Sequence, residues 1–404
     1  MIHIPDNITK DMHFLLGCPE NIDDAPEILF HPLRIDFLAD LSKVLISSGQ
    51  SRAFPDIVTF AFWCRRANIE SFAKRWDYSS LRVGLGLVLH VTPSNVPINF
   101  AYSLVFAFLA GNTSVVRLPS RDKTQYDLVI DALTILLHEK KYQSLRQTVQ
   151  LVRYDKADHI TEFWLQHSLG RIVWGGDATV ALLRSLKSHP RSREIAFVDR
   201  YSVSAIRARA VIEAEPATFH ELCTGLCNDI YIMDQNACSS PQLLVWVGNR
   251  EDIHAAQFKL WSAFQTYVKE KYTMEPVHAM DKYVDLCRDV LDHRNISSVI
   301  TDNPLLYRIE LDSLTPTQCQ QRGYFGTIHE FSAVNLNALT PVVDARFQTL
   351  TYFGFKEEAL RDFVIINRLP GIDRIVPIGR ALDMGFYWDG FDIIASLSRL
   401  IDIQ

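Results

Sequence analysis

The stretch LGLVLHVTPSNVPINFAYSLVFAFLAGNTSVVRL, residues 85–118, holds two apolar segments of strand length on either side of one of helix length. Residues 85–91 read as a strand, 98–110 as a buried helix, and 114–118 as a second strand. This order predicts a right-handed βαβ crossover, which places the two strands parallel in one sheet. Because residues 85–91 are almost wholly apolar, we expect them at the centre of a sheet covered on both faces.

The alternation of strands and helices continues along the chain. Up to residue 198 we expect helices at 124–140, at 157–167 and from near 178, and strands at 148–152, 171–174 and 194–198. Beyond it we expect helices at 217–227 and 252–271, an irregular segment at 234–241 and a strand at 243–247. Residues 1–80 read as helical. The sequence therefore predicts an α/β protein of two packed lobes, 1–198 and 199–404, with a boundary near Asp199.

The composition describes a globular, mildly acidic chain. Its 404 residues include 41 Lys and Arg and 47 Asp and Glu, which gives a formal net charge of −6, and 48% are hydrophobic. These values exclude a disordered or collagen-like protein, and they provide no basic surface for nucleic acid. No charged residue lies between Arg82 and Arg117, but prolines interrupt this run, and its apolar remainder, 98–111, is too short to span a membrane.

The cysteines are odd in number and scattered. They are Cys18, Cys64, Cys223, Cys227, Cys238, Cys287 and Cys319. This spacing does not form a disulfide framework, and residues 1–8 lack the apolar core of a signal peptide. We therefore expect a reducing, cytoplasmic setting in which thiols persist.

The segment Met233-Asp234-Gln235-Asn236-Ala237-Cys238-Ser239-Ser240-Pro241-Gln242 places a cysteine among small and polar residues before a strand. Such a loop can hold a nucleophilic thiol exposed. The alternative is a small, buried hydrophobic side chain. The residues alone leave both interpretations of Cys238 open.

A second loop, His90-Val91-Thr92-Pro93-Ser94-Asn95-Val96-Pro97, joins a buried strand to a buried helix. Prolines on both sides restrict the backbone around Asn95, so that its amide could serve as a fixed hydrogen-bond donor. A loop asparagine is more often a turn former that satisfies its own backbone, and the residues alone favour that role.

A third loop, Trp174-Gly175-Gly176-Asp177, is a turn from strand to helix, whose small residues allow phosphate oxygens to approach the helix amino terminus. It is not a G-x-G-x-x-G motif, and the chain contains no phosphate-binding G-x-x-x-x-G-K-[ST] and no G-x-S-x-G hydrolase motif. His220, Cys223 and Cys227 share a helical face but lack an evident fourth ligand, so we expect no metal.

Together these segments resemble the aldehyde dehydrogenase superfamily. That family has, in this order, a proline-flanked Asn loop, a strand ending in a basic residue, a Gly-containing turn and a Gln-x-x-Cys loop. The corresponding segments here are Pro93-Ser94-Asn95-Val96-Pro97, Gly111-Asn112-Thr113-Ser114-Val115-Val116-Arg117, Trp174-Gly175-Gly176-Asp177 and Gln235-Asn236-Ala237-Cys238.

The closer resemblance is to the LuxC-type acyl-CoA and acyl-protein thioester reductases, which make fatty aldehydes. It extends over nearly the whole chain, through Phe54-Pro55-Asp56, Phe62-Trp63-Cys64-Arg65-Arg66, Leu118-Pro119-Ser120-Arg121-Asp122, Asp199-Arg200-Tyr201-Ser202, Ala237-Cys238-Ser239-Ser240-Pro241-Gln242, Val376-Pro377-Ile378-Gly379 and Trp388-Asp389-Gly390. Each piece is weak by itself, and the order and joint presence of the pieces make the resemblance specific.

The resemblance implies an aldehyde dehydrogenase-like fold, with a Rossmann-like cofactor domain in 1–198 and a second α/β catalytic domain in 199–404. It implies that Cys238 forms an acyl-enzyme and that Asn95 stabilises the oxyanion. Ordinary aldehyde dehydrogenases carry a Glu that activates hydrolytic water, and here Phe197 stands at the corresponding position. An enzyme without that base exchanges its acyl-cysteine with a thiol, as a thioester reductase does.

The resemblance also implies a nicotinamide cofactor, held by Thr92, Pro93, Ser94, Arg117, Pro119, Ser120, Arg121, Gly175 and Gly176. We expect NADPH rather than NADH. NAD-preferring relatives often place a Glu three residues after the basic residue, whereas here Ser120 and then Arg121 follow Arg117. The alternative is that Arg117 only ends a strand and Arg121 is a solvated surface charge.

Three functions stay open at this point. The first is reduction of an acyl thioester of CoA or of a carrier protein, expected to be fatty acyl, by a homo-oligomer with an acyl-protein synthetase or acyltransferase as partner. The second is a cysteine-dependent acyltransferase or thioesterase without redox chemistry. The third, a nonenzymatic protein with a decayed site, is disfavoured because Asn95 and Cys238 are both present.

Overall fold

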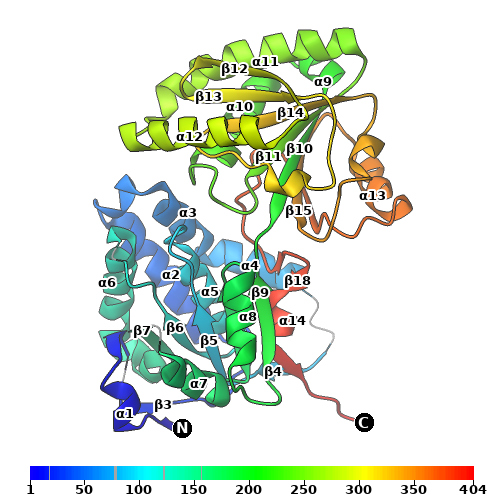
Figure 1. Ribbon diagram of the computed structural model, residues 1–404. Coiled ribbons are helices and arrows are strands. Elements are labelled where there is room, and N and C mark those ends of the chain that lie inside the picture. The colour runs from blue at the N-terminus through cyan, green and yellow to red at the C-terminus, as the bar shows by residue number, and fades with distance from the viewer. Residues whose placement is uncertain (18, 77–79, 122, 156) are drawn as a thin grey trace. The chain divides into compact units, whose positions relative to one another are not determined.

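The computed structural model describes residues 1–404 except 18, 77–79, 122 and 156 (Figure 1). The chain divides into two compact units: unit 1 comprises residues 1–199 and 385–404, and unit 2 comprises residues 200–384. We expected 199–404 to be one domain, but its C-terminal segment packs into unit 1. There β19 (Ser398–Leu400) pairs with β4 (Arg82–Gly84), and the buried Phe386 ring contacts the ring of Phe30.

Unit 1 contains a six-stranded sheet in the order β2-β7-β6-β5-β8-β9. All neighbouring strands are parallel except β2, which pairs antiparallel with β7. The strands are β2 (His13–Leu16), β5 (Leu87–Val91), β6 (Thr113–Arg117), β7 (Val149–Arg153), β8 (Gly170–Trp174) and β9 (Arg193–Phe197). The helices that connect the parallel strands are α5 (Asn99–Leu109), α6 (Thr124–His138), α7 (Asp158–His167) and α8 (Asp177–Ser185). The predicted parallel α/β architecture is confirmed.

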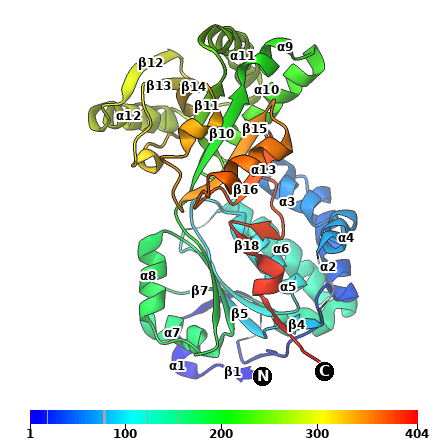
Figure 2. The ribbon, with the colours of Figure 1, turned by 90° about the vertical axis from the view of Figure 1, so that its right-hand side faces the viewer.

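Helices cover both faces of this sheet (Figure 2). Along β5, Leu87, Leu89 and Val91 pack in one apolar cluster with side chains of α7 and α8. His90 points to the opposite face and hydrogen-bonds Ser103 of α5. Strand β5 is fully buried, as its apolar sequence predicts.

The structure differs from the expectation in two places in unit 1. The strand expected at 85–91 begins only at Leu87, because Gly86 has a φ of +117°, which breaks the extended run. Residues 1–80 are not helical throughout. They contain the helices α1 (Asp6–Thr9), α2 (Pro32–Ser47), α3 (Pro55–Trp63) and α4 (Arg66–Arg75), and also β1 (Ile2–His3), β2 and β3 (Asn21–Ile22). Strand β2 exists because the edge of β7 offers it hydrogen-bond partners, a tertiary effect that local sequence does not encode.

The C-terminal segment of unit 1 adds a small hairpin and a short helix. They are β17 (Tyr387–Trp388), β18 (Phe391–Asp392) and α14 (Ile393–Ser396). The hairpin turn is formed by Asp389 and Gly390, both with positive φ. The motif Trp388-Asp389-Gly390 is therefore a structural turn, with Trp388 buried.

Unit 2 contains a seven-stranded sheet in the order β12-β13-β14-β11-β10-β15-β16, parallel except for β12. The strands are β10 (Tyr201–Arg207), β11 (Pro241–Val247), β12 (Ile296–Asn303), β13 (Leu306–Leu311), β14 (Thr327–Ala333), β15 (Phe347–Phe353) and β16 (Arg374–Pro377). The helices are α9 (Ala208–Glu213), α10 (Pro216–Tyr231), α11 (Arg250–Lys271), α12 (Pro276–Asp292) and α13 (Glu357–Ile366).

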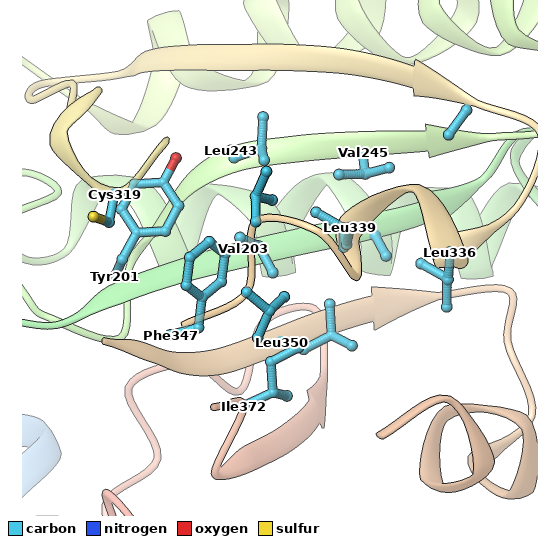
Figure 3. Packing of buried hydrophobic residues seen from close by; sticks show 14 of the residues in the cluster. Tyr201, Val203, Leu243, Val245, Cys319, Leu336, Leu339, Phe347, Leu350 and Ile372 are labelled. Atoms are coloured by element: carbon cyan, nitrogen blue, oxygen red, sulfur yellow. The ribbon is translucent and has the colours of Figure 1, made fainter. Parts of the chain in front are cut away.

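The sheet of unit 2 also separates two apolar layers. On one face, side chains of β10 and β11 pack with α10 and α11. On the other face, Tyr201, Val203, Phe347 and Leu350 belong to a cluster that includes side chains of α12 and α13 (Figure 3). Within the described part of both units, no helix is long and apolar enough to cross a membrane.

Candidate active site

The strand order of unit 1 creates a topological switch point beside β5. The chain passes from β5 to β6 and β7 on one side, and β8 and β9 lie on the other side. In open α/β sheets the carboxyl ends of the strands at such a point form the ligand crevice. The Asn95 loop follows β5 and the Gly175-Gly176 turn follows β8, so the two predicted loops leave neighbouring strands at this point.

Asn95 and Ser94 are exposed, and Thr92 and Pro93 are half-buried. The loop is attached to the adjacent strand because Thr92 Oγ1 donates to the carbonyl of Arg117 at 2.8 Å. The Asn95 side chain is therefore exposed on a loop that is attached to β6 by a hydrogen bond.

Arg117 ends β6, beside the end of β5. Its guanidinium lies over the ring of Tyr154, with 4.4 Å to the ring centroid, and donates to the Tyr154 carbonyl at 3.3 Å. Arg117 and Pro119 are half-buried, and Ser120 and Arg121 are exposed. Asp122, the nearest acid in sequence, lies outside the described residues.

The turn after β8 leaves room at the amino terminus of α8. Gly176 is the N-cap, without a side-chain cap, and a Cβ there would meet no atom within 4 Å. Gly175 is more crowded, since a Cβ would lie 3.2 Å from Thr179. The first turn of α8 carries the exposed Asp177. Its negative charge disfavours the binding of an anionic ligand at this helix end.

Phe197, which the resemblance aligns with the Glu of aldehyde dehydrogenases, ends β9 and is buried against Trp174. Trp174 Nε1 donates to Ser103 Oγ at 3.1 Å, and Ser103 lies 2.7 Å from Nδ1 of the fully buried His90. Burial lowers the pKa of His90 to about 3, so this imidazole is neutral at physiological pH. Phe197 therefore lies in a buried layer with an aromatic ring and a neutral imidazole.

Cys238 lies in unit 2, on a loop with a constrained backbone. Asp234 and Gln235 have φ of 51° and 62°, which non-glycine residues rarely adopt. The buried Gln235 holds this conformation, because its amide donates to the carbonyls of Pro241 and Thr327 at 2.9 Å each. Its Oε1 accepts from the backbone of Gly326 and Thr327. Such stored strain, held by buried hydrogen bonds, is typical of functional loops.

The Cys238 side chain is half-buried at the end of that loop. Gln348 Nε2 lies 3.5 Å from Cys238 Sγ, and Ser202 Oγ donates to the Cys238 carbonyl at 2.7 Å. The resemblance included Ser202 through the motif Asp199-Arg200-Tyr201-Ser202. No pattern in the sequence indicated Gln348, which lies more than a hundred residues along the chain from the cysteine.

Two other cysteines of unit 2 have different surroundings. Cys223 and Cys227 are buried on α10, and burial raises the pKa of each thiol to about 11. Both are therefore protonated at neutral pH and are weak nucleophiles. The described residues include no group of three or more His, Cys, Asp or Glu side chains placed to hold a metal ion.

Comparisons with known proteins bear on the family and the fold. The sequence profile of the acyl-CoA reductase (LuxC) family matches residues 50–401. A long-chain acyl-protein thioester reductase from Vibrio harveyi is 25% identical over 179 residues, which are 43% of this chain and 34% of the relative. The aligned segment thus spans about a third of the length of that relative.

Solved structures show the fold. A putative aldehyde dehydrogenase from Burkholderia cenocepacia superposes with a TM-score of 0.63 at 14% identity, over 91% of this chain and 85% of that one. A glyceraldehyde-3-phosphate dehydrogenase from Methanocaldococcus jannaschii, complexed with NADP, superposes with a TM-score of 0.60 at 12% identity, over 92% and 88%. The aldehyde dehydrogenase-like fold expected from the sequence is confirmed.

Proposed function

The chain belongs to the acyl-CoA reductase (LuxC) family, and we propose that it reduces an acyl thioester to the aldehyde with NADPH through an acyl-cysteine on Cys238. The observation that carries this proposal is the Cys238 loop, whose strained backbone and buried hydrogen bonds hold a partly accessible thiol in place. The substrate class is a thioester of CoA or of a carrier protein, with a fatty acyl group. On the family resemblance we further propose a cytoplasmic setting, a homo-oligomer, and an acyl-protein synthetase or acyltransferase as partner.

The residues at the switch point of unit 1 fit a dinucleotide in two respects. Gly176, after β8, leaves open space at the amino terminus of α8, and Arg117 supplies a cation at the end of β6, with β5 between the two strands. We propose that these residues hold the cofactor together with Thr92, Pro93 and Ser94, and with Gly175, Pro119, Ser120 and Arg121. The cofactor, when bound, supplies the reducing equivalents.

The chemistry of the chain itself begins with the Cys238 thiolate, which attacks the thioester carbonyl carbon. Negative charge then develops on the carbonyl oxygen. We propose that the Asn95 amide and the Cys238 backbone N–H donate to it, each such donor being worth about 3–4 kcal/mol. The carbon–sulfur bond to the carrier breaks, the carrier leaves as a thiolate that takes up a proton from water, and the acyl group stays on Cys238. After reduction, collapse of the adduct on Cys238 releases the aldehyde and regenerates the thiol.

The environment of Phe197 supports reduction over hydrolysis. A phenylalanine cannot abstract a proton from water, and this one is buried against Trp174. The acyl-cysteine therefore lacks the base that ordinary aldehyde dehydrogenases supply from this position. It can persist until it is reduced or transferred to a thiol.

The experiment that tests the function follows nicotinamide absorbance after mixing the protein with a fatty acyl-CoA and NADPH. Aldehyde should accumulate in step with NADPH consumption. Cys238→Ala should abolish both, whereas the matched control Cys223→Ala should keep them. Acyl transfer or free acid without NADPH consumption would instead establish the cysteine acyltransferase or thioesterase alternative.

A further inference from the structure

The sulfur and the carbonyl of Cys238 are held by two neighbouring strands of unit 2. Ser202 on β10 donates its hydroxyl proton to the Cys238 carbonyl at 2.7 Å and accepts from the backbone N–H of Thr349 at 3.2 Å. Gln348 on β15 contacts the sulfur itself. Strand β10 thus holds the carbonyl of Cys238, and strand β15 contacts its sulfur, which is the reacting atom.

Gln348 reaches the sulfur because β15 carries an irregularity at this residue. Tyr201 of β10 pairs with Phe347, but Val203 pairs with Leu350. Between these two pairs the chain moves by two residues in β10 and by three in β15, so β15 contains one extra residue. Phe347 and Leu350 both point into the same apolar cluster, as Figure 3 shows, although they are three residues apart. A bulge of this kind re-aims side chains, and bulges are frequent beside active sites.

The amide of Gln348 is oriented by its neighbour. The Thr349 hydroxyl lies 3.5 Å from Gln348 Oε1, the amide atom that can only accept. This contact leaves Nε2, the donor atom, for the sulfur. Gln348 is buried, with 1% of its surface exposed, so water competes little for this amide.

One cation, Arg374, interacts electrostatically with Cys238. Arg374 of β16 pairs in the ladder with Thr349, the neighbour of Gln348. Burial and the neighbouring Arg380 lower the pKa of the Arg374 guanidinium to about 10, while negative charge on Asp383, Asp229 and Cys238 raises it. A cation thus lies within electrostatic range of the sulfur, and by reciprocity it stabilises a negative charge there.

We propose that Gln348 is the residue that activates Cys238: its amide N–H donates to the sulfur, stabilises the thiolate and fixes the sulfur for attack. This inference rests on the proposed function, in which Cys238 is the nucleophile. The contact is made to the reacting atom, and a donor hydrogen bond is stronger to a thiolate than to a neutral thiol. A glutamine that only filled space would have no such preference between the two forms.

The test measures the rate of iodoacetamide alkylation of Cys238 against pH, with the labelled peptide identified by mass spectrometry. Gln348→Met keeps the length and removes the donor. We expect its alkylation midpoint to rise by about one pH unit, which is roughly tenfold slower alkylation at neutral pH. Gln348→Glu, which replaces the donor with a negative charge, should raise the midpoint further. Gln257→Met, the same change on α11, should leave the profile unchanged.

Two controls keep the result interpretable. Thermal melts establish that each variant is folded, and if Gln348→Met is not, Gln348→Asn takes its place, since its shorter amide cannot reach the sulfur and the same rise is expected. An unchanged midpoint in a folded variant would overturn the inference. The assay contains neither thioester nor cofactor, so a protein that shows the shift but reduces no thioester would refute the proposed function alone.

Discussion

The ring of Phe197 lies against that of Trp174, with 3.9 Å between the ring centroids. The resemblance puts the hydrolytic base of aldehyde dehydrogenases at this place, and here it is occupied by a buried aromatic pair. We therefore expect cofactor-independent release of free acid from acyl-CoA to be much slower than reduction. Chromatography of the free acid beside the nicotinamide assay measures both rates. Equal rates would contradict the interpretation and favour a hydrolase.

The second prediction is that Cys238 alone becomes acylated. Cys238→Ala should abolish the acyl-enzyme, while Cys223→Ala and Cys227→Ala should retain it, because burial raises the pKa of both α10 thiols to about 11. Peptide mapping after incubation with acyl-CoA locates the label. An acyl group found on another cysteine would refute the assignment.

The third prediction separates the two interpretations of Asn95. Its side chain is exposed, so Asn95→Ala should leave the melting temperature nearly unchanged. If the amide stabilises the oxyanion, turnover should fall by about 10²–10³-fold. A small loss of turnover, or a lower melting temperature, would show that Asn95 only forms the turn.

The sequence predicted the elements whose pattern is local. Continuous apolar runs gave the strands β5 to β9 of unit 1, and their alternation with helices gave the parallel arrangement, but in unit 2 only β11 was predicted as a strand. It could not give β2, which depends on the edge of β7, or the packing of 385–404 into unit 1, which depends on the buried Phe386. Gln348 was missed for a similar reason, since only the register of β10 against β15 brings it to Cys238.

The motif Val376-Pro377-Ile378-Gly379 shows how a recognised pattern can have a structural cause. A Cβ on Gly225 of α10 would lie 2.8 Å from the Ile378 carbonyl, so this helix and the motif can approach only through a glycine. The buried Asp229, one turn further along α10, accepts from the backbone N–H groups of Gly379 and Ala381 at 2.7 and 2.9 Å. The motif therefore packs the end of β16 against α10, through Gly225 and Asp229.

The burial of Asp229 in this contact leads to the fourth prediction, which concerns the pH dependence of stability. Burial raises the pKa of Asp229 from 3.8 to about 7, against the lowering effect of its two backbone donors. A carboxyl with a raised folded pKa contributes stability that is complete below its unfolded pKa and is lost as pH rises through the folded one. The melting temperature of the wild type, relative to Asp229→Asn, should therefore fall between about pH 4 and pH 7, by about 2–4 °C per kcal/mol lost. The exposed control Asp281→Asn should show no such trend, and a constant difference for Asp229→Asn would contradict the assignment.

The last prediction concerns cofactor choice. Arg117 ends β6 at the switch point, and the residues that follow it, Ser120 and Arg121, are exposed and bring no negative charge. A guanidinium pairs with a 2′-phosphate through charge-assisted hydrogen bonds, and losing them costs about 1.5–3 kcal/mol, or roughly 10- to 100-fold in affinity. Arg117→Ala should therefore raise the KM for NADPH by about that factor and leave the KM for NADH nearly unchanged.

The structure also supplies the competing explanation for Arg117. Its guanidinium lies over the Tyr154 ring and donates to the Tyr154 carbonyl, so it also braces β6 against the segment after β7. A purely structural role would lower the melting temperature and raise both KM values alike. Arg191→Ala serves as the matched control, because Arg191 is exposed, lies outside the proposed cofactor site, and its loss should change neither stability nor either KM. Equal use of NADPH and NADH by the unmutated protein, or an equal effect of Arg117→Ala on both, would show that Arg117 does not select the phosphate.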